Sequence, residues 1–256
     1  NNWTFYAISK RHPEVKTLFI QNGWRGYYLD IFETLDNMDS DTLDKCFVDY
    51  MLLFGSVVGE KYARYLKGSI VSIGSVKNNW MRKEMFCRRG VMAFLSQFEL
   101  HPDGVPMGEK IYSQEEFWGQ CDRLIVQNLI SYAEDKSKRF MIIPRNPKGS
   151  ETRIKEEAYF RSMTASEPEY LDAKGFYPSY QAIDASEVVV GVDSTLLYES
   201  IARGNKTAVF SIRTALLGDP LTSMIYGWPG DFANEGPFWT KNPDPDSFAR
   251  ILDYLF

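Results

Sequence analysis

The sequence predicts an α/β protein with a doubly wound, parallel sheet. Strand and helix patterns alternate along the chain, and this alternation is typical of parallel sheets. The clearest strand, residues 188–192, is a continuous apolar run, as expected for a strand that is covered on both faces. With 256 residues and 44% hydrophobic content, the chain is also long and apolar enough to fill a substantial core.

The predicted elements follow one another along the whole chain. The helices are indicated by their ends: Ser113 and Glu116 have the spacing of a capping box, Ser150 is a cap, Pro245 suits a first turn and Gly204 suits a helix end. Strands are expected at 17–20, 47–54, 69–73, 91–96, 139–143, 188–192 and 207–212, and helices at 56–66, 113–133, 150–163, 195–203 and 246–255. Residues 101–111 and 227–239 are expected to be irregular.

The segment after strand 188–192 has the composition of an anion site. Asp193, Ser194 and Thr195 stand where the strand ends and a helix begins, so short oxygen-bearing side chains meet unpaired backbone N–H groups at a positive helix terminus. A phosphate fits such a terminus. Glu199 follows a little over one turn later, where it could accept hydrogen bonds from ribose hydroxyls. The alternative is that Asp193 or Ser194 merely caps the helix.

Three other strand ends carry polar residues. Ligands of open α/β sheets bind outside the carboxyl ends of the strands. Gly74, Ser75 and Lys77 follow one strand, Ser96 and Gln97 follow a second, and Arg145 and Asn146 follow a third. The planar guanidinium of Arg145 can pair with a phosphate.

Arg145 and Lys77 can each be explained without a ligand. Arg145 is alternatively a surface arginine tied to Glu151 or Glu156, because exposed ion pairs are common. Lys77 is alternatively an ordinary solvated lysine.

Net charge, the length of the apolar runs and the cysteine content exclude several classes of function. A net charge of -5 argues against a nucleic-acid partner, although a local basic patch leaves peripheral membrane contact open. No apolar run approaches the roughly 20 residues needed to cross a bilayer, so a cytoplasmic protein is expected. Cys46, Cys87 and Cys121 are widely spaced and odd in number, which indicates buried thiols rather than disulfides or a zinc site.

Other catalytic schemes find little support. The two histidines, His12 and His101, each precede a proline in a predicted loop, and neither a P-loop nor a Gly-x-Ser-x-Gly elbow is present. The Asp-x-Asp pairs at 39–41 and 244–246 fall in a linker and at a helix start, where aspartates are favoured by the helix dipole. No metal or other cofactor is therefore expected.

Several motifs in order resemble one family. They are FIQNGWRGYYLDIF at 19–32, FG at 54–55, IGS at 73–75, IPRN at 143–146 and VVVGVDSTLLYESIARG at 188–204. Together they are similar to GT-B glycosyltransferases that build bacterial surface polysaccharides, a group with retaining CMP-Kdo transferases among its wider relatives. The resemblance implies two Rossmann-like domains, a nucleotide-sugar donor, a glycan or lipid-linked glycan acceptor such as O-antigen or capsule, and a place at the inner membrane face.

The resemblance also implies roles for single residues. Ser194, Thr195 and Glu199 match the residues that hold the donor phosphate and ribose, and Arg145 matches a phosphate-binding position. On the acceptor side, the expected catalytic residues lie near Gln21, Asn22 and Arg25. In the Kdo-transferring relatives a carboxylate is expected where this chain has Asn22. An amide cannot form a glycosyl ester, so three alternatives stay open: a different transferase, a variant with the acid replaced, or an enzyme that uses Asp30 or Asp49 instead.

On this basis residues 1–66 are expected to be the remnant of an N-terminal, acceptor-side domain, because the first residues resemble the tail of a domain. Residues 67–240 are expected to form the nucleotide-sugar domain, and 241–256 a C-terminal helix. Two other functions stay open: a nucleotide-sugar 2-epimerase, which the scarcity of histidine disfavours, and a nucleotide- or glycan-binding module without turnover.

Overall fold

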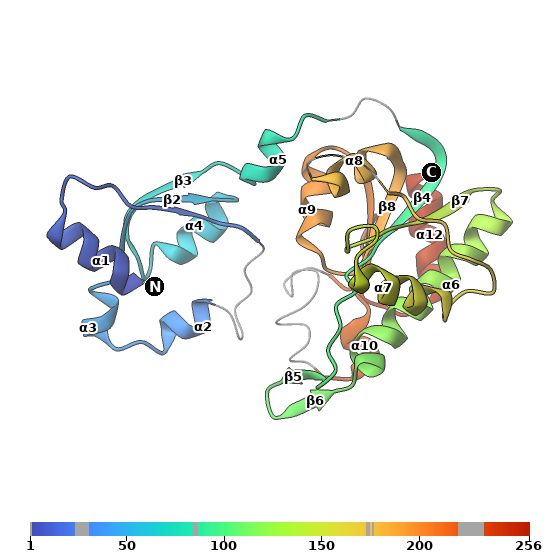
Figure 1. Cartoon of the computed structure of the whole chain (residues 1–256), viewed down its shortest axis with the longest axis horizontal. Coiled ribbons are helices and arrows are strands. Elements are labelled where there is room, and N and C mark those ends of the chain that lie inside the picture. Colours follow the sequence, from blue (N-terminus) through green and yellow to red (C-terminus); the bar gives the residue numbers. More distant parts are fainter. Residues whose placement is uncertain (1, 24–30, 84–86, 173–174, 176, 220–232) are drawn as a thin grey trace. The chain divides into compact units, whose positions relative to one another are not determined.

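The computed structural model in Figure 1 describes residues 2–23, 31–83, 87–172, 175, 177–219 and 233–256. The chain divides into two compact units, Asn1–Arg82 and Lys83–Phe256. Each unit contains its own parallel sheet, and helices connect the strands. The predicted α/β class with parallel sheets is therefore confirmed.

The N-terminal unit contains a three-stranded parallel sheet in the order β1-β2-β3. Its core forms where apolar side chains of β2 meet those of the helices, and Phe32, Leu35 and Leu53 are almost completely buried there. The elements are α1 (Asn2–Arg11), β1 (Leu18–Ile20), α2 (Ile31–Asp36), α3 (Ser40–Leu43), β2 (Phe47–Leu53), α4 (Ser56–Tyr62), β3 (Lys67–Ser72) and α5 (Val76–Trp80).

The boundary between the units lies after Arg82 and not after residue 66, as the sequence had suggested. The reason is strand pairing: β3 pairs with β2, with Met51 opposite Ile70 and Leu53 opposite Ser72. Residues 67–82, with the predicted donor-site residues of that segment, consequently belong to the N-terminal unit.

The C-terminal unit contains a five-stranded parallel sheet in the order β10-β9-β8-β4-β7. Its first strand, β4, lies between β7 and β8, so the chain builds outward on one side of β4 and then on the other. This reversal is a topological switch point. The elements are β4 (Arg88–Leu95), β5 (Val105–Met107), β6 (Lys110–Tyr112), η1 (Glu115–Gly119), α6 (Gln120–Asp135), β7 (Arg139–Ile143), α7 (Glu151–Arg161), α8 (Pro178–Ala185), β8 (Ser186–Gly191), α9 (Thr195–Ala202), β9 (Lys206–Phe210), α10 (Arg213–Leu217), β10 (Trp239–Thr240) and α12 (Pro245–Leu255).

Helices cover both faces of this sheet (Figure 1). On one face, alternate residues of β8 such as Val188 and Val190 pack in a core with α6, α7 and α12. On the other face, Gly191 lies so close to Leu197 of α9 that a Cβ atom there would stand 3.0 Å from it. The predicted C-terminal helix is part of this core, because Phe248 of α12 stacks on Phe210 at 4.4 Å.

The local details differ from the predictions at several places. The helix expected over 113–133 is a π-helix, η1, followed by α6, while the Ser113 and Glu116 capping box forms at 2.8 and 3.2 Å. The β5-β6 hairpin occupies part of a loop expected to be irregular, and α8 was not predicted. Cys87 is exposed, which corrects the expectation of three buried thiols.

Candidate functional site

The carboxyl ends of β4, β7 and β8 meet at the switch point of the C-terminal unit, where open α/β sheets bind their ligands. Gln97, just beyond β4, connects the other two strand ends. Its side-chain Oε1 accepts a hydrogen bond from the backbone N–H of Asp193 at 3.3 Å, and its backbone carbonyl accepts one from Arg145 Nη1 at 3.1 Å. The segments that follow β7 and β8 are therefore held to one common loop. We refer to this region as the switch-point edge.

The segment after β8 has the predicted strand-turn-helix form. Ser194 is the N-cap of α9, and its Oγ accepts a hydrogen bond from the backbone N–H of Leu196 at 3.3 Å. Thr195 is the first helical residue, and Gly204 follows the helix with a left-handed φ of 75°. The capping role of Ser194 is thus observed, and it places the first N–H groups of α9 at the switch-point edge.

The side chain of Asp193 does not face solvent, which differs from its expected contact with a donor. Only 3% of it is exposed, and its Oδ2 pairs with Nη1 of Arg213, the first residue of α10. The Asp193 carboxylate is in a buried ion pair. Only the backbone of Asp193 is therefore placed to contact a ligand at the switch-point edge.

The segment after β7 is organised by Glu156 of α7, whose side chain is completely buried. Its Oε1 accepts hydrogen bonds from the Arg145 N–H at 2.9 Å and from the hydroxyl of Ser96. Its Oε2 accepts from the backbone N–H and the side-chain amide of Asn146, both at 3.1 Å. The predicted Asn146 side chain is therefore bound to Glu156 rather than presented to a ligand.

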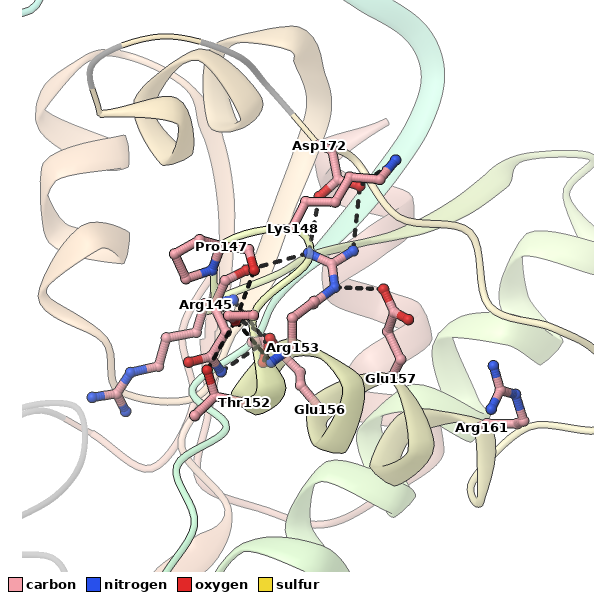
Figure 2. A network of polar contacts seen from close by, with 12 residues as sticks. Arg145, Pro147, Lys148, Thr152, Arg153, Glu156, Glu157, Arg161 and Asp172 are labelled. Carbon is pink, nitrogen blue, oxygen red and sulfur yellow. Dashed lines mark hydrogen bonds and ion pairs between the residues drawn. The ribbon is translucent and has the colours of Figure 1, made fainter.

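The Arg145 side chain is 46% exposed and pairs with Glu99 Oε2 at 2.8 Å. This ion pair differs from the suggested pairs with Glu151 or Glu156. Glu156 instead accepts a hydrogen bond from the backbone N–H of Arg145. Figure 2 shows that the guanidinium points away from the buried Arg153 network. Arg145 is consequently a cation at the switch-point edge whose backbone is fixed and whose side chain meets solvent.

Arg153, also on α7, supports the same segment from behind. Its guanidinium is 2% exposed and pairs with Glu157 at 2.7 Å and with Asp172 at 2.9 Å (Figure 2). It also lies 4.5 Å from the ring centre of Tyr170. Nη1 also donates to the carbonyl of Asn146 at 3.4 Å. Sequence reasoning missed this role, because nothing local to Arg153 marks it as buried.

Glu199 lies on α9 as predicted, but it is buried in this structure. The Tyr180 hydroxyl of α8 donates to its Oε2 at 2.7 Å. Tyr177, just before α8, has a left-handed backbone with φ of 60°, and its ring meets that of Tyr180 edge-on with centroids 6.1 Å apart. Non-glycine residues in this conformation are uncommon and gather at functional sites.

The predicted residues Gly74, Ser75 and Lys77 follow β3 of the N-terminal unit. Gly74 has a left-handed φ of 73°, and Ser75 caps α5 by accepting from the N–H of Asn78 at 3.3 Å. Lys77 is exposed on the same short helix. These residues form a strand end of their own and are not part of the switch-point edge.

The predicted catalytic residues follow β1 in the same unit. Gln21 is buried; its Oε1 accepts from the Phe54 N–H at 2.9 Å and its Nε2 donates to the carbonyl of Gly23 at 2.8 Å. Gln21 therefore holds the ends of β1 and β2 together, while Asn22 is exposed. Arg25 and Asp30 lie outside the described residues.

Asp49, the other suggested nucleophile, lies on the central strand β2, toward the amino ends of the strands. Its Oδ2 accepts from the backbone N–H of Thr17 at 2.8 Å and from its hydroxyl at 2.9 Å, at the amino end of β1. These hydrogen bonds lower the pKa of the Asp49 carboxyl. Its position gives it a structural role in aligning β1 with β2, away from the carboxyl ends of these strands.

The two Asp-x-Asp pairs are explained by helix capping. Asp39 accepts from the N–H of Thr42 at 2.9 Å as the cap of α3, and Asp244 accepts from the N–H of Ser247 at 3.2 Å as the cap of α12. In the described part of the chain, no group of three or more His, Cys, Asp or Glu residues is placed to hold a metal ion. The helices of that part likewise include none with the length and apolar composition needed to span a membrane.

The fold and the edge define an α/β protein with a doubly wound C-terminal unit whose polar strand ends converge at a switch point. Residues 18–256 match the model of a family described as "putative O-antigen biosynthesis protein". The chain belongs to this family, because the match covers nearly all of it. The search of curated proteins gave no match.

Among solved structures, one that matches is Glycyrrhiza uralensis UGT73P12 complexed with glycyrrhetinic acid 3-O-monoglucuronide. The two chains are 11% identical, with a TM-score of 0.40. The match covers 99% of this chain and 65% of that one, so this chain spans less than two thirds of the other's length.

Proposed function

We propose that this protein is a glycosyltransferase that moves a sugar from a nucleotide-activated donor to a growing bacterial surface glycan. O-antigen is a polysaccharide, so its biosynthesis requires glycosyl transfer, and the family match supports this class. The observation that carries the proposal is the switch-point edge, where the start of α9 and the Arg145 guanidinium are held to the same loop through Gln97.

In the proposed mechanism the donor phosphate binds at the first N–H groups of α9, beside Ser194 and Thr195, with Arg145 as the neighbouring cation. When the bond between the sugar and the phosphate oxygen breaks, negative charge grows on the leaving nucleotide. Fixed hydrogen-bond donors and a guanidinium stabilise that charge without reorganising. We propose that this arrangement takes the place of a divalent metal ion.

The rest of the nucleotide would lie along α9. Glu199 is the proposed partner of the ribose hydroxyls, which would require the Tyr180 hydroxyl to share or leave the carboxylate. The ring of Tyr177 is the proposed surface for the base, because its strained backbone fixes an aromatic side chain next to Tyr180.

The proposed donor is CMP-Kdo, and the proposed acceptor is a sugar hydroxyl. CMP-Kdo as donor rests on the sequence resemblance alone and stays a prediction. The acceptor hydroxyl must lose a proton as it attacks the anomeric carbon, and the segment from Gln21 to Arg25, with Asp30, is the proposed source of the residue that assists. The acceptor is proposed to be a glycan or lipid-linked glycan at the cytoplasmic face of the inner membrane.

A panel of nucleotide sugars tests this function. The whole chain would be incubated with CMP-, UDP-, GDP- and CDP-activated sugars, with and without acceptor glycan, while nucleotide release and donor identity are followed by chromatography. Release that depends on acceptor is the expected result. A changed donor sugar without release would indicate an epimerase instead, and binding without any conversion would indicate a non-catalytic module.

A further inference from the structure

A buried ion pair lies directly behind the proposed phosphate site. Asp193 immediately precedes Ser194, the cap of α9, and its carboxylate pairs with Arg213 of α10. The two side chains are 3% and 2% exposed. A carboxylate at this position is unfavourable for an anionic ligand, since two negative charges separated by a few ångströms in a poorly solvated region repel strongly. The charge of Arg213 opposes that repulsion.

Arg213 is itself held firmly in place. Its Nε donates to the carbonyl of Phe117 in η1 at 3.0 Å, and its guanidinium lies 4.2 Å from the ring centre of Trp118 and 4.9 Å from that of Phe117. These contacts come from an element nearly 100 residues earlier in the chain. Arg213 therefore connects η1 to the turn that begins α9.

Asp193 is held from a second direction. Its backbone N–H donates to Gln97 Oε1, while Oδ1 of its carboxylate is buried and has no hydrogen-bond partner among the described residues. The position of the carboxylate thus depends mainly on Arg213. A change at Arg213 would leave a buried negative charge beside Ser194 without its main counter-ion.

We propose that Arg213 is a positioning residue for the donor phosphate: it fixes the Asp193 turn at the start of α9 and cancels the negative charge of Asp193. The inference rests on the proposed function of the switch-point edge and deepens it. Arg213 acts through Asp193 and not by touching the donor.

The proposal predicts that substitutions of Arg213 and of Asp193 change nucleotide affinity differently. Arg213→Met removes the cation that opposes the Asp193 carboxylate, so nucleotide affinity is expected to fall about tenfold or more. Asp193→Asn removes the repulsive charge with little change of shape, so affinity is expected to stay equal or to rise. The double variant Asp193→Asn/Arg213→Met should recover most of the affinity lost in Arg213→Met. A purely structural pair would instead weaken binding in both single variants alike.

A second buried pair in the same unit provides the matched control. Arg203 and Asp184 are 4% and 0% exposed, and Arg203 Nε donates to Asp184 Oδ1 at 2.9 Å, near the other end of α9. Arg203→Met should lower the melting temperature comparably but reduce nucleotide affinity less than Arg213→Met, because Arg203 reaches the proposed ribose site only through the Tyr180 ring, 5.5 Å away. If Arg213→Met and Arg203→Met reduce affinity equally, or if the double variant binds no better than Arg213→Met, the proposal is wrong.

The measurement is calorimetric titration of the whole chain with CMP, UDP, GDP and CDP, joined to hydrogen exchange of the amides of residues 194–197 without ligand. Failure of the wild-type chain to bind any of these nucleotides would refute the proposed function. Faster amide exchange at 194–197 in Arg213→Met, and not in Arg203→Met, would even then support the role of Arg213 in positioning the turn. Unchanged exchange there would overturn it. If Arg213→Met does not fold, Arg213→Lys, which keeps the charge, should retain nucleotide affinity. Asp193→Asn then still tests whether loss of the Asp193 charge leaves nucleotide affinity equal or raises it, as the proposal expects.

Discussion

The backbone N–H of Arg145 donates a hydrogen bond at 2.9 Å to the carboxylate of Glu156, a residue of the following helix with no exposed surface. The same carboxylate accepts from Asn146 and from Ser96, so the ends of β4 and β7 are joined through one side chain. A buried carboxylate is tolerated when several donors surround it. The hydrogen bonds of the Glu156 carboxylate therefore replace its contacts with water and hold the loop after β7 in place at the switch-point edge.

Replacing Glu156 with Gln is expected to destabilise the protein by roughly 2–4 kcal/mol, because an NH2 group would face the N–H donors of Arg145 or Asn146. Chemical denaturation measures the loss. Glu157→Gln is the matched control on the same helix: its side chain is 33% exposed and bonds to Arg153 alone among the hydrogen bonds seen here, so a smaller loss is expected. Equal losses in the two variants would contradict the role given to Glu156.

Arg145→Ala is expected to weaken nucleotide binding by about 1.5–3 kcal/mol, the range for a charged hydrogen bond, while stability changes by less than about 0.5 kcal/mol. The reason is that the side chain is half-exposed and its backbone position is fixed independently by Glu156. Arg161→Ala is the control, since Arg161 is a 55% exposed arginine that pairs with Glu167 and is the last residue of α7. Titration calorimetry should show a loss only in the first variant.

The sequence was sufficient where structure is decided by neighbouring residues. Strand 139–143 was predicted with its observed bounds, and Ser150, Ser194 and Asp244 cap helices as their positions indicated. Capping depends on side-chain oxygens and N–H groups two or three residues apart, so it is readable from a short window. The strand-turn-helix form around Ser194 was predictable for this reason.

The sequence was not sufficient where contacts join distant segments. Glu156 bonds to Ser96, sixty residues earlier, and Arg213 bonds to Phe117, ninety-six residues earlier. Asp193 read locally as an exposed ligand residue, whereas its ion pair with Arg213 depends on how β8 and β9 pair in the sheet. Likewise, β3 joined the N-terminal sheet through pairing that no local pattern specifies.

Stability is expected to depend on pH through Asp122 of α6. Burial raises the pKa of its carboxyl to about 7, although Arg213 and the Tyr159 hydroxyl, which donates at 2.9 Å, oppose the rise. Asp193, and to a smaller degree Glu115, raise this pKa further. The folded protein thus holds a proton that the unfolded chain releases near pH 4.

Because the folded state binds this proton more tightly, the contribution is fully present below about pH 4 and is lost as pH rises toward 7. Over about three pH units at roughly 1.4 kcal/mol each, the loss is roughly 4 kcal/mol at most. Asp122→Asn keeps an acceptor for Tyr159 and should be less sensitive to pH in this window. Urea denaturation of both proteins between pH 5 and 8 tests the difference, and parallel curves would show that Asp122 does not titrate there.

Two serine caps in the same unit separate stability from ligand binding. Ser150 Oγ accepts from the N–H of Arg153 at 3.1 Å and Ser194 Oγ from that of Leu196 at 3.3 Å, so Ser150→Ala and Ser194→Ala should each cost about 1 kcal/mol of stability. Ser194 begins α9, the helix proposed to bind the donor phosphate, whereas Ser150 begins α7, whose first N–H groups have no place in the proposed mechanism. Titration with the nucleotide that the wild-type chain binds should therefore show weaker affinity in Ser194→Ala and unchanged affinity in Ser150→Ala. If both variants bind the nucleotide as tightly as the wild-type chain, the Ser194 hydroxyl does not contact the donor and acts only as a cap.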